Sequence, residues 1–167
     1  MDTFNPLGAI TISLANAGAV AGTTNTFTTT AATVPIIKGK FGTALGVLTN
    51  SATTPTTDAN TAAAFPAITA NNCAAVVFGT NAAGTLSAVQ GPIIPTVAGV
   101  TTTVGAFILA PQFPPIPDDF CPFAYTIVRV SPTGATFTLG TTSWAASGIS
   151  CATFANVAQL PPRPQIA

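Results

Sequence analysis

The feature that most constrains the fold of this chain is a run of closely spaced prolines ahead of an alternating apolar segment. Proline fixes φ at about −65° and has no backbone N–H to donate, so it disrupts helix interiors and central strands. Residues 111–122 are therefore predicted to be an extended connection, neither a helix nor a central strand. The prolines that carry this argument are Pro114, Pro115, Pro117 and Pro122.

The connection leads into the clearest strand pattern of the sequence, residues 123–130, in which β-branched and aromatic residues dominate. Successive side chains of a strand point to opposite faces. Phe123, Tyr125 and Ile127 are therefore predicted to share one face with Arg129. We expect the three apolar side chains of this face to point into the core.

The rest of the chain is divided by glycine and proline into short β-patterned runs, and long segments with helical periodicity are absent. Loops at 79–84 and 131–134 are each predicted to join two strands into a hairpin. A surface loop is expected at 49–60, followed by a single helical turn at 61–64. The predicted strands are 10–14, 34–40, 73–78, 85–90, 104–110, 123–130, 135–139 and 148–157.

These runs indicate one all-β domain over residues 1–167, an antiparallel β-sandwich or barrel-like fold of about eight to ten short strands. Residues 1–9 are predicted to be an extended N-terminal arm and residues 10–159 the β body. Residues 160–167 form a proline-rich, polyproline-like tail that is suited to lying along a neighbouring molecule.

The surface is expected to carry very little charge. Charged residues make up 5% of the chain, with four Lys plus Arg and four Asp plus Glu, whereas about 25% is ordinary for a globular domain. A near-neutral surface gives little repulsion between molecules, so the protein is expected to associate with itself or with partners. The composition indicates a component of an assembly.

Catalysis has few candidate residues, because the chain has no histidine and only four acidic side chains. Adjacent carboxylates in an extended segment point to opposite sides, so Asp118 and Asp119 are not expected to hold one ligand together. We interpret one as a cap of the turn after Pro117 and the other as a partner of Arg129 or of a neighbouring subunit. With Arg163, these charged side chains are the candidate contacts with other subunits or with a partner protein, and we predict no catalytic residue, cofactor or metal.

Nucleic-acid binding and membrane insertion are not expected either. Lys38 and Lys40 do not make the broad basic surface that nucleic acids require, and no apolar stretch approaches the ~20 residues of a membrane span. No Lys or Arg precedes Lys38, so a basic secretory signal is not predicted and the chain is expected to be made in the cytoplasm. Cys73, Cys121 and Cys151 are accordingly predicted to be reduced, buried thiols.

Several spaced blocks within residues 34–163 resemble a family of small virion proteins of tailed bacteriophages that accompany the major capsid protein. The blocks are 57–65, Val76-Val77-Phe78-Gly79, 82–85, Gln90-Gly91, 111–118 and Cys121-Pro122-Phe123-Ala124-Tyr125. The resemblance implies a decoration, or cement, protein on the capsid surface of the virion, with a compact β body that clamps adjacent capsomers. It also implies the major capsid protein as partner, self-association as a trimer, and no catalytic residues.

Another class of function remains open from the sequence. A head or tail fibre module that binds host glycans would share the threonine-rich β composition. Trp144 and Tyr125 would then be the candidate stacking platforms for sugar rings. The alternative role for Trp144, which we favour, is an anchor in the core or at an interface. A hydrolase is a third, more distant alternative.

Overall fold

The computed structural model describes residues 10–50, 54–151 and 153–165, and these contain eleven β-strands and no helix. Every strand pairing is antiparallel, so the predicted all-β class is confirmed. The predicted N-terminal arm, residues 1–9, lies outside the described residues. The strands are β1 (Ile12–Ser13), β2 (Val20–Ala21), β3 (Phe27–Thr28), β4 (Pro35–Ile37), β5 (Lys40–Phe41), β6 (Asn72–Thr80), β7 (Leu86–Gln90), β8 (Ile94–Pro95), β9 (Cys121–Val130), β10 (Ile149–Cys151) and β11 (Ala155–Asn156).

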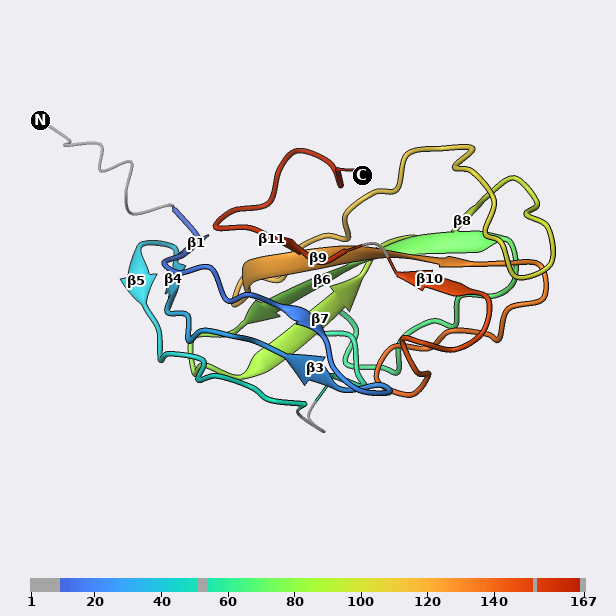
Figure 1. Ribbon diagram of the computed structural model, residues 1–167. Helices are drawn as coiled ribbons and strands as arrows, with labels where there is room; N and C mark the ends of the chain where they lie inside the picture. Colours follow the sequence, from blue (N-terminus) through green and yellow to red (C-terminus); the bar gives the residue numbers. More distant parts are fainter. Residues whose placement is uncertain (1–9, 51–53, 152, 166–167) are drawn as a thin grey trace, which may run out of the picture.

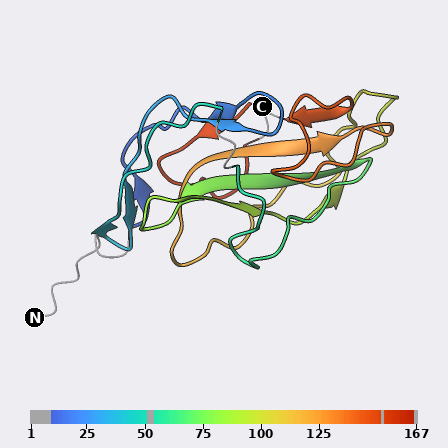
Figure 2. The ribbon, with the colours of Figure 1, turned by 90° about the horizontal axis from the view of Figure 1, so that it is seen from below.

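The two longest strands, β6 and β9, run side by side through the middle of the molecule (Figure 2). The sheet has the order β10-β9-β6-β7, with β11 also paired to β9 and β8 also paired to β6. The predicted hairpin of 73–78 with 85–90 is confirmed as β6 and β7. The strand expected at 123–130 is β9, and it contacts strands from both halves of the chain.

An irregularity in β9 changes which face its first residues occupy. Phe78 lies opposite Ala124, but Gly79 lies opposite Pro122, so Phe123 is an extra residue in the β9 register. Such a β-bulge reverses the alternation of side chains on one side of it. Phe123 therefore points to the same face as Ala124 and not to the face of Tyr125, and the predicted shared face is wrong at Phe123.

The bulge also explains why proline occurs inside a central strand. The connection was predicted to last to residue 122, but β9 begins at Cys121 and includes Pro122. Pro122 lies next to the bulge, where the regular ladder is interrupted and a missing N–H is tolerated. Residues 111–120 do form an irregular connection, as predicted. Pro111 and Pro114 of this connection are buried.

Hydrophobic residues pack on both faces of the central sheet. On one face, β6 and β9 bury side chains against the first fifty residues, and Phe27 stacks on Phe78 with ring centroids 4.5 Å apart. On the other face, Tyr125 packs against Phe113 of the proline connection, with 4.9 Å between ring centroids. Figure 1 shows this layering, with β3 on one side of β9 and the C-terminal segment on the other.

The strand predicted at 34–40 is a tight hairpin instead. β4 and β5 are joined by Lys38 and Gly39, both of which have positive φ, at 50° and 76°. Positive φ at both central residues is the geometry of the two-residue turns that match strand twist. The sequence prediction missed this turn because lysine rarely adopts positive φ.

The free edge of β7 is covered by a segment that was expected to be a surface loop. Asp58 is 4% exposed, and its Oδ2 accepts the backbone N–H of Gln90 at 2.9 Å while its Oδ1 accepts that of Asn60 at 2.7 Å. Ala59 donates its N–H to the carbonyl of Ala88, at 2.9 Å. A side chain and a backbone group thus replace the missing neighbouring strand, which protects the edge from pairing with other chains.

Other predicted elements differ from the structure. The expected helical turn at 61–64 is a non-helical turn, because Ala62 has a φ of 55°. Residues 104–110 form no strand; Phe107 makes a single bridge to Thr96. Residues 135–139 do not pair with β9, since Phe137 bridges to Ile68. The long strand at 148–157 is two short strands, β10 and β11, that both pair with β9.

Candidate functional site

The adjacent carboxylates of Asp118 and Asp119 diverge, as predicted. Asp118 Oδ2 lies 3.1 Å from Lys38 Nζ, and both side chains are largely exposed. Asp119 Oδ1 accepts the backbone N–H of Ala82 at 3.0 Å, which ties the connection to the β6–β7 loop. Neither carboxylate bonds to Arg129, so the interpretation that paired one of them with Arg129 within the chain is wrong.

Arg129 holds a different part of the molecule. Its guanidinium carbon lies 4.9 Å from the centre of the Phe107 ring, and its Nη1 donates to the carbonyl of Gly105 at 3.3 Å. An arginine above an aromatic face is attracted by the ring electrons, more strongly where water is excluded. Arg129 therefore fastens residues 105–107 to the end of β9.

Arg163 lies in the C-terminal segment, and its side chain is exposed. The predicted tail was expected to lie along a neighbour, but its described part packs on its own chain. Pro164 is buried, and the N–H of Gln165 donates to the hydroxyl of Tyr125 at 3.0 Å. Among the four candidate contact residues, Asp118, Asp119 and Arg163 thus remain exposed, while Arg129 is partly buried.

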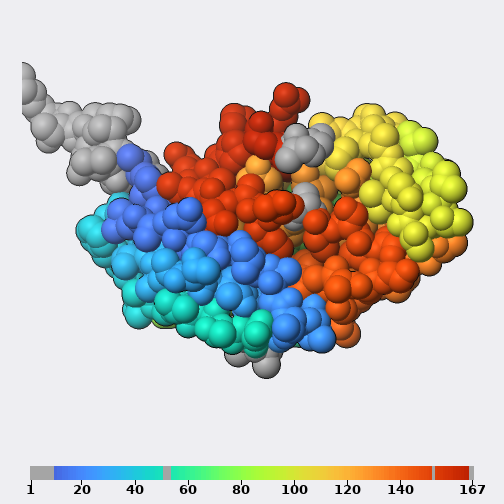
Figure 3. Space-filling view, viewed as in Figure 1, coloured from blue at the N-terminus to red at the C-terminus, as the bar shows by residue number. Residues whose placement is uncertain are grey.

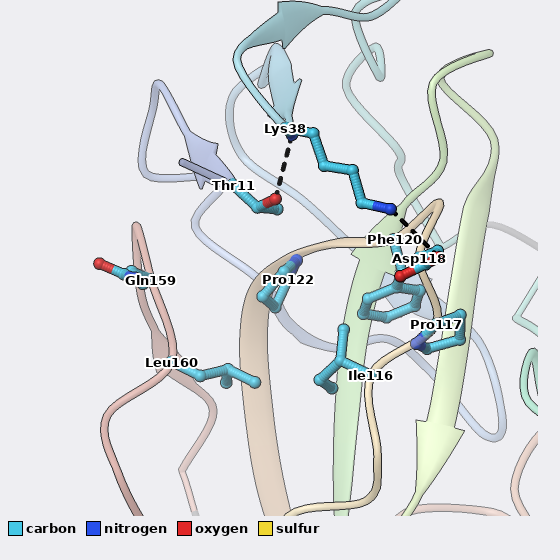
Figure 4. A pocket seen from close by; sticks show the side chains of 9 residues that line it. All are labelled: Thr11, Lys38, Ile116, Pro117, Asp118, Phe120, Pro122, Gln159 and Leu160. Atoms are coloured by element: carbon cyan, nitrogen blue, oxygen red, sulfur yellow. Dashed lines mark hydrogen bonds and ion pairs between the residues drawn. The ribbon is translucent and has the colours of Figure 1, made fainter. Parts of the chain in front are cut away.

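An open hollow of about 320 Å³ lies where three parts of the chain meet (Figure 4). These parts are the small N-terminal sheet of β1, β4 and β5, the proline connection and the C-terminal segment. The Lys38–Asp118 ion pair crosses one side of it, and Lys38 N–H donates to the Thr11 hydroxyl at 3.2 Å. Apolar side chains form much of the remaining wall. The lining residues are Thr11, Lys38, Ile116, Pro117, Asp118, Phe120, Pro122, Gln159 and Leu160.

Trp144 and Tyr125, the candidate sugar platforms, are both buried. Trp144 is 7% exposed, contacts Phe78, Phe137 and Phe154, and donates its Nε1–H to the carbonyl of Thr26 at 2.8 Å. Tyr125 is 2% exposed. Neither ring offers an open face to a sugar. Trp144 is therefore a core anchor, and the burial of both rings does not favour glycan binding through them.

The cysteines are free thiols that burial makes weakly acidic. Burial raises the pKa of Cys73 and of Cys121 to about 11 each, and that of Cys151 to about 12. Cys151 is only partly buried, and it packs against the core cluster that contains Phe27 and Phe78. Thiolate is the reactive form of cysteine, so these thiols are poor nucleophiles at neutral pH. The described residues contain no group of three or more His, Cys, Asp or Glu that could hold a metal ion.

The structural feature that sequence reasoning missed is an exposed apolar lobe formed by residues 93–110. Five of the eleven large hydrophobic side chains that are exposed in the described part of the chain lie in it. They are Ile93, Val97, Val100, Ile108 and Leu109. The signal in the sequence is the absence of any charged residue between Asp58 and Asp118, a stretch that contains the largely buried strands β6 and β7 as well as this exposed segment. Residues 104–110 were instead assigned to a strand.

Comparisons of the chain with protein-family models, curated proteins and solved structures gave no match. No helix capable of crossing a membrane occurs in the described ranges.

Proposed function

We propose that this protein is a structural component of a bacteriophage virion, a decoration protein that binds the outside of the capsid and stabilises the shell. The observation that carries the proposal is a packed β body whose surface exposes many apolar side chains and few charges. Large exposed apolar patches on a protein mark surfaces that other proteins cover. The apolar lobe contributes five exposed side chains, and Leu14, Phe41 and Val47 are further exposed apolar residues among the first fifty.

The environments of the charged side chains support a binding role over a catalytic one. Asp58 and Asp119 accept backbone N–H groups, and Asp118 forms an ion pair with Lys38. Arg129 is engaged with Phe107. Each of these groups stabilises the chain's own fold, and the one pair of titratable groups among them, Asp118 with Lys38, is a largely exposed ion pair.

The proposed partners are the major capsid protein and further copies of this chain, in a trimer. The sequence blocks that resemble small virion proteins of tailed bacteriophages support this proposal. Several of them are accounted for by structural roles here: Asp58 seals the sheet edge, and Gly79 lies at the β-bulge opposite Pro122. The site of action is then the capsid surface, after synthesis in the host cytoplasm.

Binding to shells that lack the protein tests the proposal. Purified protein should sediment with undecorated shells up to a fixed ratio, and it should raise the temperature at which those shells open, because a ligand that binds the intact form stabilises it. Failure to sediment with shells from the phage that encodes the chain would contradict the proposal.

Asp118 and Asp119 provide a variant for the same assay. The double change Asp118→Asn and Asp119→Asn keeps the side-chain oxygen that can accept the Ala82 N–H, so the melting temperature of the free protein should hardly change. Shell binding should weaken and its dependence on salt should decrease if the exposed carboxylates contact the shell. Unchanged binding would remove both residues from the proposed contact.

A further inference from the structure

The apolar lobe is a defined structural unit at one end of the molecule. Its two arms are joined by a bridge between Thr96 and Phe107 and by a hydrogen bond from Val97 N–H to the carbonyl of Ala106, at 2.9 Å. Figure 3 shows its atoms gathered in a single protrusion, coloured yellow to yellow-green. The exposed fractions of Val100 and Leu109 are 73% and 61%, and with Ile93, Val97 and Ile108 they form a group of exposed apolar side chains on one segment.

Close packing of the two arms gives the lobe a fixed shape. Gly99 lies against the carbonyl of Thr103, and Gly105 lies against the carbonyl of Val97, with no room for a side chain at either glycine. Thr103 also donates its N–H to the carbonyl of Val100 at 2.9 Å. A surface that is already ordered loses less conformational entropy when a partner binds.

The underside of the lobe is fastened to the central sheet. Arg129 at the end of β9 contacts the Phe107 ring and the Gly105 carbonyl, and Thr133 donates its N–H to the carbonyl of Thr101 at 3.3 Å. The charge of Arg129 is thus directed into the molecule. Residues 93–110 themselves contain no charged side chain, and the exposed residues of the lobe are valine, isoleucine, leucine, alanine, threonine and one proline.

We infer that the apolar lobe is a self-association surface, onto which the lobe of a second copy of this chain docks. In a symmetric contact the side chains nearest the symmetry axis meet their own counterparts, so a charged residue at the axis would face a like charge. A lobe without charge avoids this repulsion. Interfaces between identical subunits are also more apolar than other interfaces, and charged residues are depleted at their centres. A partner with a charged surface would find no complementary group on the lobe.

The size of the lobe indicates a reversible contact. A standard interface takes roughly 20–30 residues from each partner, whereas twelve of the residues between 93 and 110 are exposed. Contact between lobes alone should therefore depend on protein concentration, and it would be strengthened where a lattice holds copies near one another. This inference rests on the self-association part of the proposed function and is independent of capsid binding.

The test measures association of the isolated protein by sedimentation velocity over a wide concentration range. The double change Val100→Asp and Leu109→Asp places like charges at the centre of the contact, which should weaken association roughly 100-fold or more. The matched control is Val47→Asp, at a side chain that is 56% exposed and lies outside the lobe. All variants should melt near the wild-type temperature, because the replaced side chains are on the surface.

A second measurement does not depend on disrupting the contact. Val100→Cys adds an exposed thiol to a chain whose native thiols have raised pKa values, so a short bismaleimide should link two copies through residue 100 far more efficiently than it links the wild type.

A wild-type protein that is monomeric at all concentrations, or equal weakening by Val47→Asp, would overturn the inference. So would unchanged association of the lobe variant. A lobe variant that associates normally but no longer binds shells would assign the lobe to the capsid instead.

Discussion

At the scale of single residues, Phe123 offers the most direct test of the core. It is fully buried and packs near Phe27, with 6.3 Å between ring centroids. Phe123→Ala should lower the free energy of unfolding by about 3–5 kcal/mol, through lost burial and the cavity that remains. The matched control is Phe41→Ala, because Phe41 is 73% exposed and should contribute little. Denaturant titrations of both variants measure the difference, and equal effects would contradict the described core.

The buried thiols should make the fold sensitive to alkali. Burial raises the pKa of Cys73 and Cys121 from 9.0 to about 11, so the folded protein holds these protons more tightly than the unfolded chain. Below pH 9 both states keep the protons and the contribution of the thiols to stability is fully present. As the pH rises from 9 through 11, the unfolded chain releases its protons first and stability falls.

Melting temperatures across this pH range provide the measurement for the thiols. Cys121→Ala removes one of the titrating groups, so its stability should fall less steeply than that of the wild type between pH 9 and 11, by up to about 1.4 kcal/mol per pH unit. Parallel pH profiles for the variant and the wild type would show that the Cys121 thiol ionises equally in both states.

Burial of individual residues could be predicted from the sequence more easily than the direction in which they point. Phe123, Tyr125 and Ile127 are all buried, as expected from their types. Their division between two faces depends on one extra residue in β9. That extra residue is recognised only from the pairing with β6, in which Phe78 faces Ala124 but Gly79 faces Pro122. A bulge is a property of two paired strands, so the alternation within one strand does not reveal it.

At the scale of elements, the edge of the central sheet depends on Asp58. Asp58→Ala would leave the N–H groups of Gln90 and Asn60 without their acceptor. The Gln90 N–H is buried, and a buried, unpaired N–H costs about 1–3 kcal/mol, whereas the Asn60 N–H is only partly buried. The control is Asp118→Ala, which breaks an exposed ion pair worth ~0–1 kcal/mol at most. Urea unfolding should show a clear loss for Asp58→Ala and almost none for Asp118→Ala, and the reverse order would be evidence against the edge cap.

The element predictions succeeded for the local β6–β7 hairpin, and they failed both where pairing is distant and where a local turn uses an unusual backbone angle. The β6–β7 hairpin follows from two β-patterned runs and a loop with two glycines and an Asn. By contrast, Phe137 pairs with Ile68 across the molecule, and Lys38 turns the chain with a positive φ. A tertiary contact decides the first feature, and the second depends on a positive φ that lysine rarely adopts, so the local pattern reveals neither. Of the candidate contacts, the divergence of Asp118 and Asp119 was predictable, but the partner of Arg129 was not.

At the scale of the whole molecule, the scarcity of charge and the exposed apolar surface both favour association with other molecules. The core covers both faces of the central sheet, so the fold does not require Phe41, Val47, Val100 or Leu109 to be buried, and they stay exposed. A protein with such a surface and no net charge is poorly protected against association when free. Attachment to a shell, with copies side by side, would cover that surface.

Cryo-electron microscopy of the native virus particle, combined with counting of protein copies by mass spectrometry, tests the central claim most directly. The account predicts that this β fold occupies repeated positions on the outside of the capsid, in a copy number of the same order as the major capsid protein. Absence from the shell, or a few copies confined to the tail, would contradict it.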